Sequence, residues 1–144
     1  MAKTATASKA LTPIIAVDSV DQMRSFYVDQ LGFAHQMGVV GKDGQFDFCT
    51  VTMDGANIMF SRASGAEAAS QSGRGKQPVE IYLEVADVEA YHDVLKKKHV
   101  TITDGLTLQW WGDRTFKVLD PAGYAIWFYQ NVSEPKPPAG AKIV

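Results

Sequence analysis

Residues 55–60 read Gly-Ala-Asn-Ile-Met-Phe, and residues 123–128 read Gly-Tyr-Ala-Ile-Trp-Phe. The two runs lie 123 − 55 = 68 residues apart. A second pair keeps this spacing, because Ile-Ala-Val-Asp-Ser-Val at 15–20 matches Leu-Glu-Val-Ala-Asp-Val at 83–88, and 83 − 15 = 68. Two distant matches in one register indicate an internal repeat, and this repeat decides the fold.

Each copy is predicted to be one βαβββ module, which makes the fold class α+β. A strand-like run leads into a helical pattern that begins after Ser19, and three more strand-like runs follow. By the same spacing, Phe48 is expected to correspond to Phe116. The expected segments are, in order, an N-terminal tail (1–10), module 1 (11–62), a Gly/Ala/Ser-rich linker (63–78), module 2 (79–130) and a C-terminal tail (131–144).

The composition of the chain narrows the classes of protein to which it could belong. The chain has 144 residues, of which 46% are hydrophobic and 21% charged, so we expect one folded domain with a real core. The formal net charge of −2 argues against nucleic acid as a partner, since phosphate contacts need a basic surface. No run is apolar enough to span a membrane, and the N-terminal residues do not resemble a secretory signal. Together with the single Cys49, this predicts a cytoplasmic protein.

Alternation assigns two faces to the predicted strands. We expect one face to cover the helices, and it carries Val79, Ile81, Leu83, Val85, Ile126 and Phe128. The opposite face, called the front here, carries Glu80, Tyr82, Glu84, Trp127 and Tyr129. A front with carboxylates and large aromatic rings is not an ordinary core surface. It predicts a concave, partly polar cavity.

The order of short motifs resembles the vicinal-oxygen-chelate superfamily of glyoxalases, ring-cleaving dioxygenases and bleomycin-binding proteins. The motifs are Val-Asp-Ser-Val (17–20), Ser-Phe-Tyr (25–27), Leu-Gly-Phe (31–33), Val-Ala-Asp-Val (85–88), Trp-Gly-Asp-Arg-Thr-Phe (111–116) and Asp-Pro-Ala-Gly (120–123). The last two are most similar to the bleomycin-resistance branch. The resemblance covers residues 11–130. It implies a curved mixed sheet that forms a cup, with the helices on the outer face.

Enzymes of this family hold a divalent metal at four front positions, and the resemblance places Thr12, Met59, Glu80 and Trp127 there. Typical ligands at these positions are His, Glu or Gln. Only Glu80 would bind such a cation well, and one carboxylate with a hydroxyl does not complete a coordination shell. We therefore expect no metal and no other cofactor.

Aromatic residues cluster in module 2 and are the strongest candidates for a ligand site. Tryptophan faces bind flat or cationic molecules by stacking and by cation–π attraction. Packing in the core remains the alternative for Trp110, and a solvated rim position remains the alternative for Glu84. The predicted ligand-binding residues are Trp127, Trp111, Trp110, Tyr82, Tyr129, Glu80, Met59, Thr12 and Phe48.

Two functions stay open at this point, and a third, a domain without a small-molecule role, is disfavoured by the polar front. The first is a metal-free binding protein that sequesters a planar small molecule, aromatic or cationic, such as a bleomycin-type antibiotic. The second is an enzyme of the same fold: a metal-dependent glyoxalase-like lyase, isomerase or dioxygenase with an atypical site, or a metal-free variant with Glu80 as the catalytic base. A homodimer is expected in either case, because pairing would cover open strand edges and the open cup. In similar binding proteins the cup lies between modules of two chains.

Overall fold

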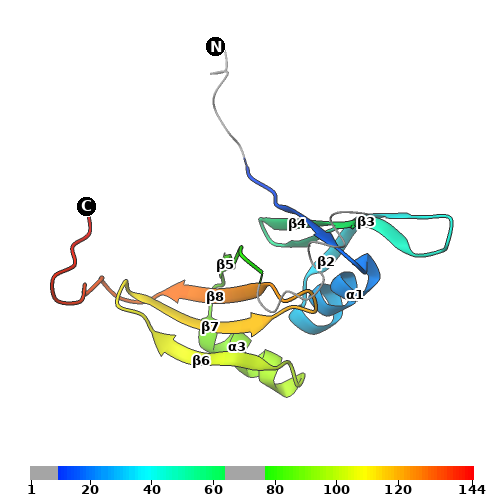
Figure 1. Ribbon diagram of the computed structural model, residues 1–144. Helices are drawn as coiled ribbons and strands as arrows, with labels where there is room; N and C mark the ends of the chain where they lie inside the picture. The colour runs from blue at the N-terminus through cyan, green and yellow to red at the C-terminus, as the bar shows by residue number, and fades with distance from the viewer. Residues whose placement is uncertain (1–9, 64–76) are drawn as a thin grey trace, which may run out of the picture.

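The computed structural model describes residues 10–63 and 77–144, and it contains two α+β modules in tandem (Figure 1). The elements of module 1 are β1 (Ile14–Val17), α1 (Val20–Ser25), η1 (Phe26–Leu31), β2 (Ala34–Val40), β3 (Phe46–Met53) and β4 (Ala56–Arg62). Those of module 2 are β5 (Ile81–Glu84), α3 (Val88–Lys97), β6 (Ile102–Leu108), β7 (Asp113–Leu119) and β8 (Ala125–Asn131). The predicted linker lies almost wholly outside the described residues.

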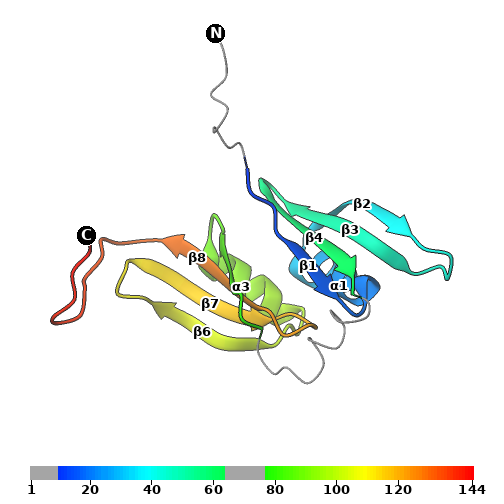
Figure 2. The same cartoon turned by 45° about the horizontal axis from the view of Figure 1, so that its top comes forward.

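The two modules build separate sheets of the same design. The strand orders are β1-β4-β3-β2 and β5-β8-β7-β6, and in each sheet the first pair is parallel and the others antiparallel. Figure 2 shows the two sheets apart from each other, one in each module. Ile14 pairs with Met59 and Tyr82 pairs with Trp127, and both partners are shifted by 68 residues. The predicted repeat is therefore confirmed in the pairing of the strands.

One predicted equivalence is wrong. Phe116 pairs with Phe128, whereas the residue that pairs with Phe60 is Cys49, so Phe116 corresponds to Cys49 and not to Phe48. The reason is a longer turn in module 2. Residues 53–56 separate the paired positions 52 and 57, whereas residues 120–124 separate positions 119 and 125. This extra residue changes the spacing from 68 to 67, and the change exchanges the two faces along β7.

The first helical segment begins where the sequence predicts but changes its winding. The Ser19 hydroxyl accepts a hydrogen bond from the backbone N–H of Gln22, at 3.1 Å, and caps α1. From Phe26 the chain continues as the π-helix η1 and ends at Gly32, whose φ of 89° is the left-handed cap expected of glycine. Phe26, Tyr27 and Leu31 of this π-helix are buried.

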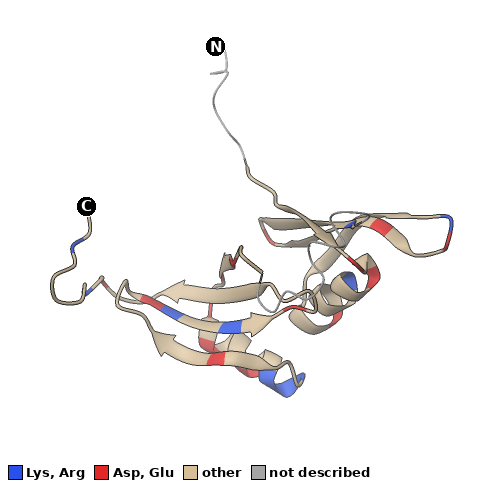
Figure 3. Ribbon diagram, viewed as in Figure 1, with Lys and Arg blue, Asp and Glu red and all other residues tan. Residues whose placement is uncertain are grey.

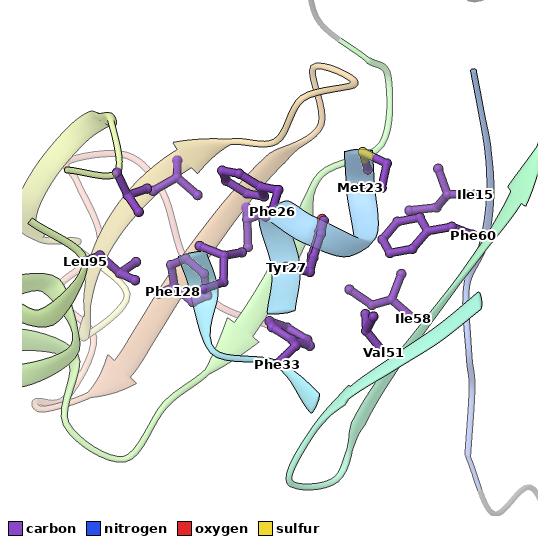
Figure 4. Packing of buried hydrophobic residues seen from close by; sticks show 14 of the residues in the cluster. Ile15, Met23, Phe26, Tyr27, Phe33, Val51, Ile58, Phe60, Leu95 and Phe128 are labelled. Carbon is purple, nitrogen blue, oxygen red and sulfur yellow. The ribbon is translucent and has the colours of Figure 1, made fainter. Parts of the chain in front are cut away.

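This helical segment belongs to module 1 and lies between its sheet and module 2. In Figure 4, Tyr27 lies next to Phe60 of module 1, while Phe26 points toward the side of Phe128 and Leu95 of module 2. Buried residues of both modules form one hydrophobic cluster. The helix-facing sides of both sheets therefore contribute to a shared core, and the fronts are the opposite faces of these sheets.

Two hydrogen bonds also cross between the modules. The Tyr27 hydroxyl donates to Asp120 Oδ2 at 2.8 Å, and both residues are buried. The Tyr91 hydroxyl on α3 donates to the backbone carbonyl of Leu31 at 2.6 Å. Burial, together with the neighbouring Asp120, raises the pKa of Tyr27 well above its usual 10.0. Tyr27 therefore stays neutral and remains a donor at ordinary pH.

None of the helices in residues 10–63 and 77–144 has the length and apolar character that crossing a membrane would require.

Candidate ligand-binding site

Four aromatic side chains gather on the front of the module 2 sheet, and we call Tyr82, Trp111, Trp127 and Tyr129 the aromatic platform. Tyr82 and Tyr129 stack with their ring centroids 4.3 Å apart and their planes 19° apart. Trp127 lies 5.8 Å from Tyr82 and 6.4 Å from Trp111 by centroids. The sequence predicted all four as site residues, and the structure places them side by side.

A chain of hydrogen bonds holds part of this platform in place. The Trp111 indole N–H donates to the Tyr82 hydroxyl at 2.9 Å, and that hydroxyl donates to Asp113 Oδ2 at 2.7 Å. The Asn131 amide donates to the other oxygen of Asp113 at 3.0 Å. Burial, followed by the bond to Asp113, raises the pKa of Tyr82 to about 12. The hydroxyl therefore remains a donor, and the rings it connects are oriented before any ligand arrives.

Trp111 owes its position to the turn between β6 and β7. Gly112 follows it with a φ of 100°, and a β-carbon there would collide with the backbone oxygen of Ser133. The Gly112 carbonyl accepts hydrogen bonds from the N–H groups of Val132 and Ser133, so the end of β8 is tied to this turn. Trp110 lies beside Trp111 in an edge-to-face contact of 5.6 Å and is 44% exposed. Trp110 is therefore a rim residue and not a core residue.

Charged groups surround Trp127. Its indole N–H donates to Glu80 Oε1 at 3.2 Å, and the Lys117 ammonium lies 4.2 Å from the ring centroid. Burial, followed by the charge of Glu84, raises the pKa of Tyr129. Figure 3 shows acidic and basic positions mixed along β6 and β7. The platform thus combines apolar ring surface with polar groups at fixed positions, as ligand pockets do.

The predicted site residues of module 1 lie on the front of the other sheet. Met59 on β4 pairs with Ile14, and Phe48 on β3 pairs with Ser61. Thr12 precedes β1 and is partly buried. No described strand of this sheet pairs with a strand of module 2, so these residues and the platform belong to separate sheets.

The residues at the four expected metal positions do not fit a divalent metal. The Trp127 indole has no lone pair to offer and donates its N–H to Glu80, which occupies one carboxylate oxygen. Thr12 and Met59 add a hydroxyl and a thioether, which are poor partners for a hard or borderline cation. Among the described residues, no three His, Cys, Asp or Glu side chains are grouped as a metal would need.

Lys117 and Asp113 were missed as site residues by the sequence analysis. Both lie on β7 and alternate with the buried Phe116 and Val118. This alternation was a usable signal, because residues at odd positions of this strand must face the front when the even ones enter the core.

A separate cavity of about 770 Å³ lies between the modules. The end of η1, the β3–β4 turn, the end of β5 and one side of α3 line it. It includes none of the platform residues. Its acidic lining residues are Asp54, Glu84 and Asp87, and Lys98 is its basic one.

Comparisons with known proteins identify a family and several relatives. The family model for the Glyoxalase/Bleomycin resistance protein/Dioxygenase superfamily matches residues 9–128. Uncharacterized proteins of Mycobacterium bovis and Mycobacterium tuberculosis are each 29% identical to this chain over 119 residues. These matches cover 80% of this chain and 78% and 70% of the two proteins, respectively.

Solved structures share the fold. TioX from Micromonospora sp. ML1 superposes with a TM-score of 0.69 at 18% identity, covering 87% of this chain and 100% of TioX. TnmS3, described as an antibiotic binding protein from Streptomyces sp. CB03234, superposes with a TM-score of 0.68 at 22% identity. That match covers 89% of this chain and 99% of TnmS3. At these identities the likeness establishes the architecture alone.

Proposed function

This chain belongs to the Glyoxalase/Bleomycin resistance protein/Dioxygenase superfamily, and we propose that it binds and sequesters a planar small molecule on the aromatic platform. The observation that carries the proposal is the set of rings on the front of module 2, two of them locked through the Tyr82 hydroxyl. Aromatic faces bind flat molecules by stacking, and rings fixed in advance lose little entropy when the ligand binds.

The ligand class we propose is a planar antibiotic, with bleomycin-type glycopeptides as the reference because they carry flat rings and positive charge. The carboxylates of Glu80 and Glu84 lie beside the platform and favour a cationic group near its edge. TnmS3 has the same fold and is described as an antibiotic binding protein, which supports this class of ligand. Sequestration needs affinity only, and the platform supplies apolar area for it.

Trp127→Ala tests the proposal. We expect the affinity for bleomycin to fall by about 1–3 kcal/mol in a calorimetric titration, the range for a well-used aromatic contact. The fold should survive, because Trp127 is only half-buried. Its neighbour Phe128 faces the core, so Phe128→Ala is the matched control that should lower the melting temperature instead. A large loss of melting temperature in Trp127→Ala with unchanged affinity would refute the binding role.

We also propose that binding requires no metal, since the four expected ligand positions hold one carboxylate, a hydroxyl, a thioether and an indole. Elemental analysis after mild purification should find no stoichiometric divalent metal. One equivalent of zinc, nickel, iron or manganese per chain would contradict this. It would favour the metal-dependent glyoxalase-like lyase, isomerase or dioxygenase.

A homodimer would complete the site. The front of module 2 is open in the single chain, where Tyr82 is 44% exposed, and Ile14 on the front of module 1 is 64% exposed. Exposed apolar surfaces of this kind mark interaction sites. We propose that a second copy covers them and brings Met59, Thr12 and Phe48 to a platform. Sedimentation should give twice the chain mass of 15.7 kDa. A stable monomer at micromolar concentration would contradict the dimer.

We propose the cytoplasm as the location. Cys49 is fully buried, and burial raises the pKa of its thiol to about 11, so it behaves as a small core residue without redox chemistry. Cell fractionation followed by immunoblotting should find the chain with the cytoplasmic markers, and recovery with the membranes would contradict this.

A further inference from the structure

Four side chains form a row across the front of the module 2 sheet. Tyr82 on β5 pairs with Trp127 on β8, Trp127 pairs with Lys117 on β7, and Lys117 pairs with Asp104 on β6. Directly paired residues on one face lie in contact distance of each other. Trp127 is therefore flanked by an aromatic ring on one side and by a cation on the other.

The cation in this row is engaged on both sides. The Lys117 ammonium lies 4.2 Å from the centroid of the Trp127 ring and 3.1 Å from Asp104 Oδ2. Its side chain is only 19% exposed, whereas that of Asp104 is 57% exposed. An ammonium at this distance from an indole makes a cation–π contact, and tryptophan is the best aromatic partner for such a contact. The position that a ligand cation would prefer is thus already filled from within the chain.

We infer that Lys117 determines the ligand specificity of the platform, because it occupies the cation position on Trp127 and selects against ligands that would place positive charge there. The inference rests on the proposed function and defines the ligand more closely. Without Lys117, Trp127 would lie between the carboxylates of Glu80 and Asp104, a setting that attracts cations. Lys117 removes that attraction at the ring face.

The selection acts on charge position and not on ring size. A cationic group must displace the Lys117 ammonium from the Trp127 ring. The remaining ion pair with the exposed Asp104 compensates little for this loss, because exposed ion pairs contribute little. A neutral ring can pack against the edge of Trp127 and stack on the neighbouring faces of Tyr82, Tyr129 and Trp111, none of which has a described cation above it, so Lys117 stays in place. A bleomycin-type ligand would therefore bind with its flat rings on the platform and its positive charge at the platform edge.

Two matched probes test this inference: 1-methylquinolinium, a planar cation, and quinoline, the uncharged counterpart at neutral pH. Both are titrated calorimetrically into the full chain. Lys117→Met should bind 1-methylquinolinium about three- to tenfold more tightly than the wild type does, with quinoline unchanged within about twofold. Lys117→Arg should show no such gain, because a guanidinium also stacks on an indole. Melting curves check that each variant folds.

Lys97→Met is the matched charge control. It removes the same positive charge from the exposed end of α3, on the other side of the sheet from the platform. If Lys97→Met tightens the binding of 1-methylquinolinium as much as Lys117→Met does, a general charge effect explains the result and the inference is overturned. Equal gains for both probes in Lys117→Met, or no gain for either, overturn it as well.

Failure of the proposed function gives a different result. If neither probe binds the wild type, or if Trp127→Ala binds quinoline as well as the wild type does, the platform is not a binding site and both ideas fall. If quinoline binding depends on Trp127 while Lys117→Met leaves 1-methylquinolinium unchanged, only the role of Lys117 is overturned.

Discussion

The two modules pair their strands in the same order, but their fronts differ in chemistry. The central row in module 2 runs Tyr82, Trp127, Lys117, Asp104. The corresponding row in module 1 runs Ile14, Met59, Thr50, Met37. The first row holds two aromatic rings and an ion pair, and the second holds no ring and no charge. A repeated backbone thus supports two surfaces, and module 2 carries the residues suited to holding a flat ligand.

The backs of the sheets show the opposite relation, because both pack the same way against the helical segments. Phe60 and Phe128 are equivalent positions, and both are fully buried. The two sheets therefore share a helix-facing back and differ in their fronts. Substitutions on the two sides of the sheets can test this separation.

Phe60→Ala and Phe128→Ala should each lower the free energy of unfolding by about 3–5 kcal/mol, since each leaves a large cavity in the common core. Urea denaturation followed by circular dichroism measures both. Comparable losses are expected because the two positions are equivalent. If one variant kept nearly wild-type stability, the backs of the two modules would not be alike, and the comparison would fail.

Tyr27→Phe should lower the free energy of unfolding by about 1–3 kcal/mol, because it leaves a buried oxygen of Asp120 without its hydroxyl donor. Asp120→Asn should also destabilise, and the double variant should cost less than the sum of the two single changes. Chemical denaturation of the four proteins of this cycle gives the coupling energy. Strict additivity would show that this bond does not join the modules.

Alkaline pH should weaken the wild type more than it weakens Tyr27→Phe. The folded pKa of Tyr27 is raised above its usual 10.0, so the unfolded chain loses this proton first. The stabilising contribution of neutral Tyr27 is complete below about pH 10 and is lost as the pH rises toward the folded value. Above pH 10 the wild type should lose about 1.4 kcal/mol more per pH unit than the variant does. Parallel slopes in denaturation experiments would contradict the buried, neutral state of Tyr27.

Tyr82→Phe should cost less stability than the changes above, about 0.5–1.5 kcal/mol, since it removes one hydroxyl that connects Trp111 with Asp113. The same change should weaken binding to the platform by freeing the Trp111 ring. Ile14→Val is the matched change at the equivalent position of module 1. Ile14 is mostly exposed, so its effect should stay within about 0.5 kcal/mol. Equal effects on ligand affinity would remove the distinction between the two fronts.

The sequence was sufficient for the architecture because the repeat is carried by matched strands. The 68-residue offset predicted that Trp127 and Met59 occupy equivalent positions on equivalent strands, and alternation placed both on the front. The error at Phe48 arose because a single added residue in a turn changes the register without changing the strand pattern. Most of the platform could be predicted from residue types and alternation, which put Tyr82, Trp127 and Tyr129 on one face of the sheet.

The sequence could not supply contacts that depend on pairing between distant strands. Lys117 lies on the Trp127 ring only because the β7–β8 register brings the two together, and that register depends on the turn length. The bond between Tyr27 and Asp120 joins residues 93 positions apart in different modules. No local pattern specifies such a pair. The change from α-helix to π-helix at Phe26 likewise has no signal in the residues that form it.

The described strand pairs all join strands of the same module, and this has a consequence for the time course of folding. Each sheet closes within its own module, where paired residues lie no more than 45 positions apart, whereas the junction around Tyr27 requires two finished surfaces to meet. Contacts that form after the rate-limiting step affect the unfolding rate and leave the folding rate nearly unchanged. Tyr27→Phe should therefore act on the unfolding limb of a chevron plot, and Phe60→Ala on both limbs. Contacts within a module would then form before or during the rate-limiting step, and contacts between the modules would form after it.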